Sequence, residues 1–121
     1  MFIGRYRYDR KVPITEDLTV AVSLFHSLGD QNRLAIIRRL GWGEARVRDL
    51  TDELMLAQST VSEHVACLRD CGLLVVRTEG RQNFYSLASP EVIDLLEAAE
   101  RLLAETGYKV DLCPAYGKGT R

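Results

Sequence analysis

Two short helical patterns lie close together in the middle of the chain, in residues 44–55 (EARVRDLTDELM) and residues 57–72 (AQSTVSEHVACLRDCG). In each segment, apolar residues recur at the spacing of one helix face. They are Val47, Leu50 and Leu54 in the first segment and Val61, Val65 and Leu68 in the second. Only a brief turn, around residues 56–59, separates the two patterns. The sequence therefore predicts a helix-turn-helix, although the turn lacks the glycine often found there.

The hydrophobic period changes directly after this pair. Residues 73–88 (LLVVRTEGRQNFYSLA) carry β-branched and aromatic residues on either side of EGRQ, which is typical of a β-hairpin. A helix-turn-helix followed by a hairpin is a winged helix. In that fold the helix carrying Ser59 to Arg69 enters the DNA major groove. We expect the hairpin to reach the DNA backbone or minor groove with Arg77 or Arg81.

Further helices are predicted on both sides of this unit. Residues 15–29 form the first, with Thr15 as its N-cap, and residues 30–43 form the second, with Asp30 as its N-cap. A long helix is expected over residues 90–107, because proline suits its first turn and glycine its end. The predicted fold class is thus mainly α: a winged helix-turn-helix of four helices, a hairpin wing and a C-terminal helix.

The first and last helices carry more apolar surface than one small core can cover. Their stripes are Leu18, Ala21, Val22, Phe25 and Leu28 in the first helix, and Val92, Leu95, Leu96, Ala99, Leu102 and Leu103 in the last. A chain of 121 residues builds a single modest core. Pairing with a second copy would bury the surplus, so we expect a homodimer. The alternative is that both helices simply complete the core of one copy.

The predicted elements divide the chain into three parts, the last of which carries Cys113 as a candidate metal-binding tail. Residues 1–14 form a basic N-terminal arm, residues 15–107 the winged helix-turn-helix domain with dimerisation helices at both ends, and residues 108–121 a C-terminal tail. The formal net charge of −1 gives no argument for nucleic acid. Acids outnumber bases from residue 89 onward, so a DNA surface is expected before that point. The start lacks the apolar core of a secretory signal and no apolar run is long enough to span a membrane, which predicts a cytoplasmic protein without a membrane partner.

The start of the second helix-turn-helix segment, QSTVSEH, is rich in short polar side chains. They are Gln58, Ser59, Thr60, Ser62 and His64, which can bond phosphate oxygens and base edges. Free N–H groups at the helix start add an anion site. Phosphate contacts are expected from Arg69, Arg77 and Arg81, so DNA binding should weaken with salt. By itself, the stretch could also be an ordinary polar helix start.

The chain has three cysteines, and two of them lie on one helix face. Cys67 and Cys71 are four residues apart, which places their Cβ atoms about 5–6 Å from each other and off the apolar face. Two thiolates at that spacing can bind one metal ion, and Cys113 from the tail would supply a third sulfur. Three thiolates favour soft cations such as cadmium, lead, mercury, arsenite or copper(I). Zinc would need a fourth ligand from His64, an acid or water. Each cysteine could instead be a small packing residue.

Several motifs together resemble the ArsR/SmtB family of metal-sensing repressors. They are SLGDQNRLAIIRRL and LTDELMLAQSTVSEHVACLRDCGLLVVRTEGRQNFYSL, and the resemblance covers roughly residues 18–106. The chain has DQNR where the family often has Asp-Pro-Thr-Arg. Within the family, CLRDCGLL followed by LCPAYG is similar to the CmtR type, whose members sense cadmium and lead.

This resemblance implies a homodimer that binds operator DNA when metal-free and releases it when metal binds. It implies a metal site made by Cys67, Cys71 and Cys113, with Cd²⁺ or Pb²⁺ as inducer and Zn²⁺ also able to bind. It places Ser59, Thr60, Ser62 and His64 in the recognition helix and Arg81 in the wing.

Other functions remain open at this point. The thiols could sense oxidation in a redox-responsive repressor. The chain could also be a metal-buffering protein without specific DNA binding. An enzyme is not expected, because no nucleophile–base pair, glycine-rich phosphate loop or paired carboxylates are visible. The sequence does not say whether cadmium or lead is the inducer. It also does not say which subunit supplies Cys113, or which operator is bound.

Overall fold

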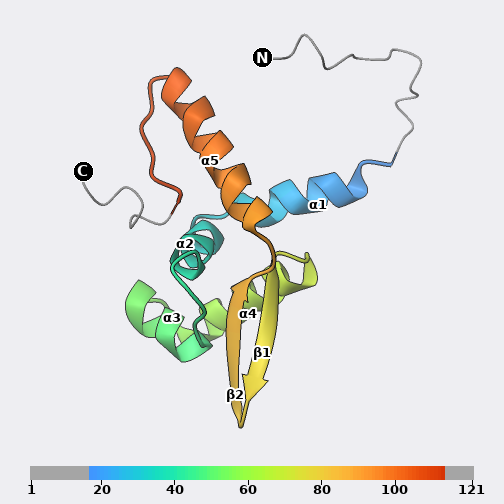
Figure 1. Ribbon diagram of the computed structural model, residues 1–121, viewed down its shortest axis with the longest axis vertical. Helices are drawn as coiled ribbons and strands as arrows, with labels where there is room; N and C mark the ends of the chain where they lie inside the picture. The colour runs from blue at the N-terminus through green and yellow to red at the C-terminus, as the bar shows by residue number, and fades with distance from the viewer. Residues whose placement is uncertain (1–16, 114–121) are drawn as a thin grey trace.

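The computed structural model describes residues 17–113. Its elements are α1 (Thr19–Leu28), α2 (Gln31–Leu40), α3 (Val47–Leu54), α4 (Gln58–Asp70), β1 (Leu74–Glu79), β2 (Gln82–Leu87) and α5 (Pro90–Glu105). Figure 1 shows α2, α3 and α4 at the centre, with the hairpin extending away from α1 and α5. The predicted winged helix-turn-helix is confirmed.

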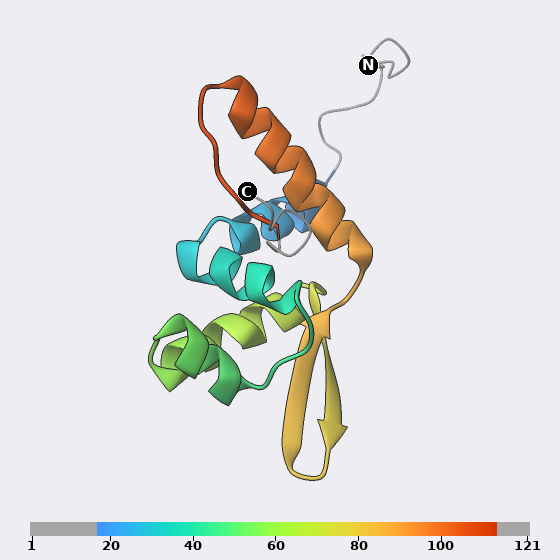
Figure 2. The same cartoon turned by 60° about the vertical axis from the view of Figure 1, so that its left-hand side comes forward.

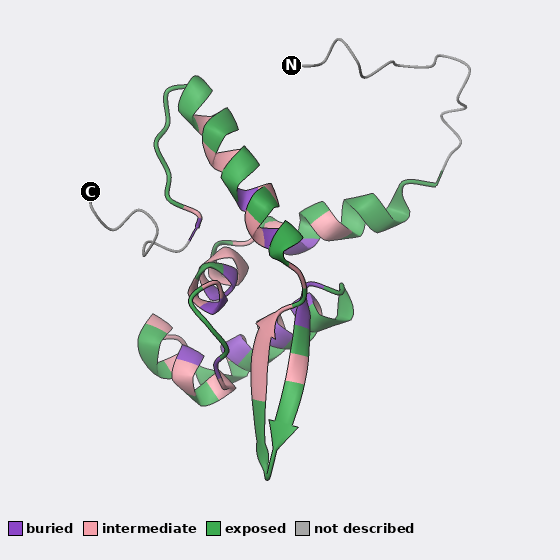
Figure 3. Ribbon diagram, in the orientation of Figure 1, coloured by how far each residue is buried: buried purple, intermediate pink, exposed green. Residues whose placement is uncertain are grey.

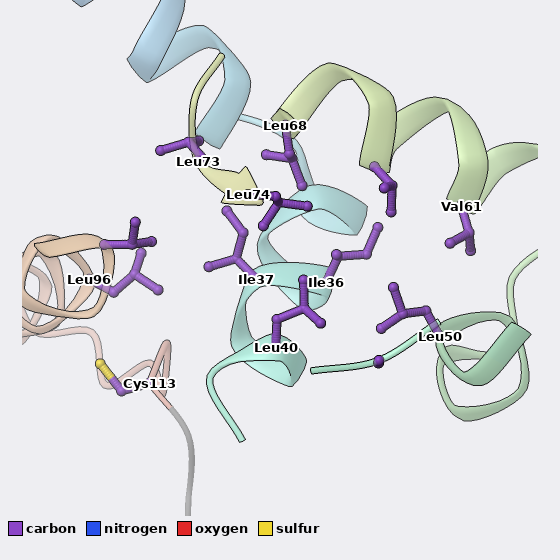
Figure 4. Packing of buried hydrophobic residues seen from close by; sticks show 13 residues of the cluster. Ile36, Ile37, Leu40, Leu50, Val61, Leu68, Leu73, Leu74, Leu96 and Cys113 are labelled. Carbon is purple, nitrogen blue, oxygen red and sulfur yellow. The ribbon is translucent and has the colours of Figure 1, made fainter. Parts of the chain in front are cut away.

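The core forms around α2. Asp30 caps this helix as predicted, because its side chain accepts a hydrogen bond from the Arg33 backbone N–H. Ile36 and Ile37 are fully buried between α3, α4 and the start of the wing (Figure 4). The apolar residues that complete the cluster include Leu40, Leu50, Val61, Val65, Leu68, Leu73, Leu74, Val92 and Leu96. The period-based assignment of the inward faces of α3 and α4 is therefore confirmed.

In the turn between α3 and α4, Met55 takes the position where a glycine is often found. Met55 follows α3 with φ 58° and ψ 44°, the left-handed conformation that glycine usually takes after a helix. Its side chain is 88% exposed, so no packing holds it there. The backbone N–H of Met55 bonds to the Thr51 carbonyl, which closes the helix end. The helix-turn-helix thus forms at the cost of one strained residue.

The wing is a two-stranded antiparallel hairpin. Its register runs from Leu74 opposite Leu87 to Glu79 opposite Gln82. Two backbone hydrogen bonds join Ala45 to Tyr85 and fix the hairpin to the segment before α3. Figure 2 shows the hairpin projecting beyond the helices. Its tip is therefore free to reach a neighbouring molecule.

The outer helices behave as surplus surface. Helix α1 begins at Thr19, later than predicted, and the predicted cap Thr15 lies outside the described residues. Leu28 at the end of its predicted stripe packs against the core, but the rest of the stripe is exposed in the single chain, with Val22 and Phe25 each 62% exposed (Figure 3). At the other end, Leu102 of α5 is 64% exposed. The stripe of α1 therefore does not complete the core of one copy.

No helix among residues 17–113 is long and apolar enough to cross a membrane.

Candidate functional site

The start of α4 presents the predicted polar side chains to solvent. Gln58, Ser59 and Ser62 are exposed, and Thr60 is half-buried. The N-cap residue Ala57 makes no side-chain cap, so it leaves the first-turn N–H groups to other acceptors. These groups together form a polar helix end suited to phosphate oxygens.

Among the predicted DNA contacts on α4, His64 differs because its ring contacts Arg33 and Asp30 of the same domain. Its side chain is 15% exposed. Arg33 Nη1 lies 3.2 Å from His64 Nδ1, and Asp30 Oδ1 lies 3.9 Å from His64 Nε2. The Arg33 backbone N–H, and then the His64 ring, lower the pKa of Asp30. The structure thus ties His64 to the junction of α1 and α2.

The two wing arginines have different surroundings. Arg77 Nη2 donates to Glu44 at 2.6 Å and Nη1 to Glu79 at 2.7 Å, and its guanidinium lies 4.6 Å from the centre of the Phe84 ring. The hydrogen bonds to Glu44 and Glu79 raise the pKa of Arg77. Its charge is therefore already matched by Glu44, in the segment before α3, and by Glu79 of the wing. Arg81 lies exposed between the strands and can approach a phosphate.

Arg69, the third predicted phosphate contact, is exposed in the last turn of α4, far along the helix from its polar start.

The two α4 cysteines lie on one side of the helix, as their spacing predicts. Cys67 is half-buried and Cys71 is exposed. The Ser27 hydroxyl of α1 lies 2.7 Å from Cys71 Sγ and 4.0 Å from Cys67 Sγ. Exposure of Cys71 argues against a packing role for that residue. Sequence reasoning missed Ser27, since nothing in the stripe of α1 marks a serine as a partner of residues forty or more positions away.

Cys113 lies elsewhere, between α2 and α5, in a cleft that Ala35 and Arg38 of α2 also line. It is 3% exposed, and its Sγ is 3.9 Å from the Ile93 carbonyl oxygen. Figure 4 places it beside Leu96, away from Leu68 on α4. Within residues 17–113, no group of three or more His, Cys, Asp or Glu side chains is arranged to hold a metal ion. One chain therefore brings together two of the three predicted sulfurs.

Hydrogen bonds from two helices, α5 and α2, hold the tail residues around Cys113 in place. The Glu100 carboxylate accepts hydrogen bonds from the backbone N–H groups of Leu112 and Cys113, the latter at 2.8 Å. Arg38 Nη1 donates to the Asp111 carbonyl at 2.9 Å. Sequence reasoning did not identify Glu100 or Arg38, because acids and arginines on helices are ordinary surface residues.

The fold, the exposed polar helix start and the projecting wing define a winged helix-turn-helix DNA-binding protein. Residues 30–75 match the family described as bacterial regulatory protein, arsR family. The chain is 33% identical over 103 residues to the probable mercury resistance operon repressor of Streptomyces lividans, covering 85% of this chain and 82% of that protein. The chain belongs to the arsR family of bacterial regulatory proteins. It is therefore a transcriptional regulator and not an enzyme.

Two solved structures extend the comparison. The homodimeric winged helix-turn-helix domain Mb0332 of Mycobacterium bovis superposes with a TM-score of 0.68 at 25% identity, over 83% of this chain and 90% of that one. The cadmium sensor CmtR of Mycobacterium tuberculosis gives a TM-score of 0.56 at 38% identity, over 64% of this chain and 80% of that one.

Proposed function

We propose that this regulator is a homodimeric repressor that binds operator DNA when metal-free and releases it when a soft metal ion, cadmium or lead, binds Cys67, Cys71 and Cys113. One observation carries the proposal: two free thiols, Cys67 and the C-cap residue Cys71, lie together at the C-terminal end of α4, the helix whose start we propose to contact DNA. A ligand held by them acts directly on the DNA-reading element.

The DNA surface is proposed from the exposed groups. Ser59 and Ser62 would read base edges and phosphates from the start of α4, while Arg81 would reach the backbone from the wing. Because Arg77 is paired with Glu44 before α3 and with Glu79 of the wing, we expect it to position the hairpin more than to neutralise a phosphate. A partner of this kind places the protein in the cytoplasm.

The dimer is proposed from the exposed α1 stripe. Leu18, Val22 and Phe25 recur at helical spacing, and each is more than half exposed. A second copy with the same stripe would bury it around a two-fold axis. The homodimeric neighbour described above supports the pairing of two copies.

The donor set fits a soft cation in part. Thiolates suit cadmium, lead or mercury better than hard cations, and the sulfurs of Cys67 and Cys71 share one side of α4. The third sulfur would come from the partner's tail or from release of the docked tail, because Cys113 lies in the α2–α5 cleft. Zn²⁺ would require a further ligand.

The mechanism follows from where these residues lie. Cys67 and Cys71 would hold the ion at the C-terminal end of α4, where metal–sulfur bonds would link the two side chains. This end is joined to α1 through Ser27, so fixing the thiols fixes α4 against the dimer helix. A coupling of about 1–3 kcal/mol changes operator affinity by about 5- to 150-fold.

A thiol-oxidation sensor is the second candidate. The observation that favours it is the exposed Cys71, which an oxidant could reach directly. Peroxide, rather than cadmium under reducing conditions, would then release DNA.

Serine variants of the three cysteines test the proposal. Reduced protein on its own promoter DNA is titrated with cadmium without oxygen, and fluorescence anisotropy and the sulfur-to-metal ultraviolet band are followed together. We expect Cys67→Ser and Cys71→Ser to retain DNA binding and to lose the metal response. If Cys113→Ser keeps both the band and metal-induced release, the tail is removed from the site. Release by peroxide alone would favour the oxidation sensor.

A further inference from the structure

Ser27 joins α1 to the thiol pair. It is the buried residue of α1, at 2% exposure, on a helix whose other side chains are half-buried or exposed. A buried hydroxyl requires hydrogen-bond partners. The partners of Ser27 Oγ are two sulfurs, Cys71 Sγ at 2.7 Å and Cys67 Sγ at 4.0 Å. The contact between α1 and the end of α4 therefore depends on the state of these thiols.

The backbone carbonyl of Ser27 is also connected to α4, through Arg33 and His64. The Ser27 carbonyl accepts a hydrogen bond of 2.6 Å from Arg33 Nε. Arg33 Nη1 lies 3.2 Å from His64 Nδ1, and Arg33 Nη2 donates to the His26 carbonyl. One guanidinium thus bridges the end of α1 and the DNA-reading half of α4. The path from Cys71 to His64 passes through Ser27 and Arg33.

We propose that Ser27 is the positioning residue that couples occupancy of the Cys67–Cys71 thiol pair to the DNA-reading half of α4, through Arg33 and His64. This inference rests on the proposed metal response and adds the route by which it acts. Groups that bond to the ligands of a metal orient those ligands, and their removal is felt strongly at the site.

Ser27 contacts the two thiols unequally, and this difference indicates which thiol acts on α1. Ser27 Oγ is close to Cys71 and distant from Cys67, so a ligand shared by both sulfurs would act on Ser27 mainly through the Cys71 contact. Ser27 is buried, so water cannot readily replace that contact. The end of α1 therefore moves with the thiols, and the Arg33 bridge carries the movement to His64.

Ser27→Ala tests the route, with Ser23→Ala as the matched control. Ser23 is exposed and lies one turn earlier on α1. DNA affinity is measured with and without saturating cadmium, and saturation is checked by the ultraviolet band. We expect Ser23→Ala to release DNA like the wild type. Ser27→Ala should bind metal-free DNA normally. The release ratio is the DNA affinity without cadmium divided by the affinity with saturating cadmium, and in Ser27→Ala it should be at least about fivefold smaller than in the wild type. A wild-type ratio in Ser27→Ala overturns the inference.

A second readout follows the route without DNA. The chain has two histidines, so the imidazole resonances of His64 can be assigned and monitored by NMR. Cadmium should shift them in the wild type and Ser23→Ala, but much less in Ser27→Ala. Unchanged His64 shifts across all three proteins contradict the route even if DNA release is altered.

Arg33→Lys decides the matter if Ser27→Ala does not fold. Lysine keeps the charge but lacks the planar fork that reaches the Ser27 carbonyl and His64 together. We expect it to weaken the cadmium response and leave the ultraviolet band intact, whereas an unchanged response would refute the bridge. If the wild type itself ignores cadmium, the proposed function fails, and this inference fails with it.

Discussion

Removal of the Glu100 carboxylate should undock the tail and expose Cys113. This carboxylate accepts two backbone N–H groups, those of Leu112 and Cys113, and holds the tail over α5. Cys113 is 3% exposed in the docked tail, so a reagent reaches its sulfur mainly when the tail opens. We therefore expect Glu100→Ala to raise the reactivity of Cys113.

The magnitude follows from the two hydrogen bonds. A hydrogen bond to a charged group contributes about 1.5–3 kcal/mol when well shielded. Two such bonds would contribute about 3–6 kcal/mol, and because Glu100 is only half-buried we reduce the contribution of the pair to about 2 kcal/mol. Because about 1.4 kcal/mol corresponds to a factor of ten, the open population should rise at least tenfold. Arg38, which donates to the Asp111 carbonyl, remains to limit the effect.

The assay is alkylation of Cys113 in a Cys67→Ser, Cys71→Ser background, where it is the sole thiol. When opening and closing are fast, the rate follows the open population. Glu100→Gln retains one acceptor oxygen and should give an intermediate rate. Glu97→Ala, an exposed acid one turn earlier, is the control and should not change the rate. Equal rates for Glu100→Ala and the wild type would refute the docking role of the carboxylate.

Three further predictions concern stability and DNA affinity. Met55→Gly should stabilise the domain by about 0.5–1 kcal/mol in urea unfolding, because it relieves a left-handed residue without losing packing; destabilisation would contradict this reading of the turn. Hydrogen bonds from Arg46 lower the pKa of Asp49 to about 2. A lowered folded-state pKa stabilises the protein above the unfolded value of 3.8, so the stability difference between wild type and Asp49→Asn should stay constant above pH 5 and disappear as the pH falls toward 2; a difference that does not change with pH would contradict it. Arg81→Ala should weaken DNA binding at all sequences and lower the salt slope by about one, and an unchanged slope would show that Arg81 does not contact a phosphate.

Most of the fold could be predicted because it depends on local periodicity. The stripes of α3 and α4 pointed inward as expected, and the Asp30 cap fixed the start of α2. The start of α1 was placed too early. Asp17 bonds to the Thr19 backbone N–H instead, and the helix begins there.

The site was predictable only where it lies on one element. The common face of Cys67 and Cys71 follows from helix geometry. The contacts of Ser27 and Arg33 join residues more than thirty positions apart, and no local pattern encodes them. The buried position of Cys113 depends on Glu100, an acid that the sequence does not distinguish from its neighbours.

The central claim is that a soft metal ion on α4 releases DNA. The direct measurement is the anisotropy of reduced wild-type protein on its promoter DNA, titrated with cadmium under anaerobic conditions. We expect salt-sensitive DNA binding that is lost as about one metal ion per subunit is added, in keeping with a single site per chain. DNA binding that persists through several equivalents of cadmium and of lead would contradict it.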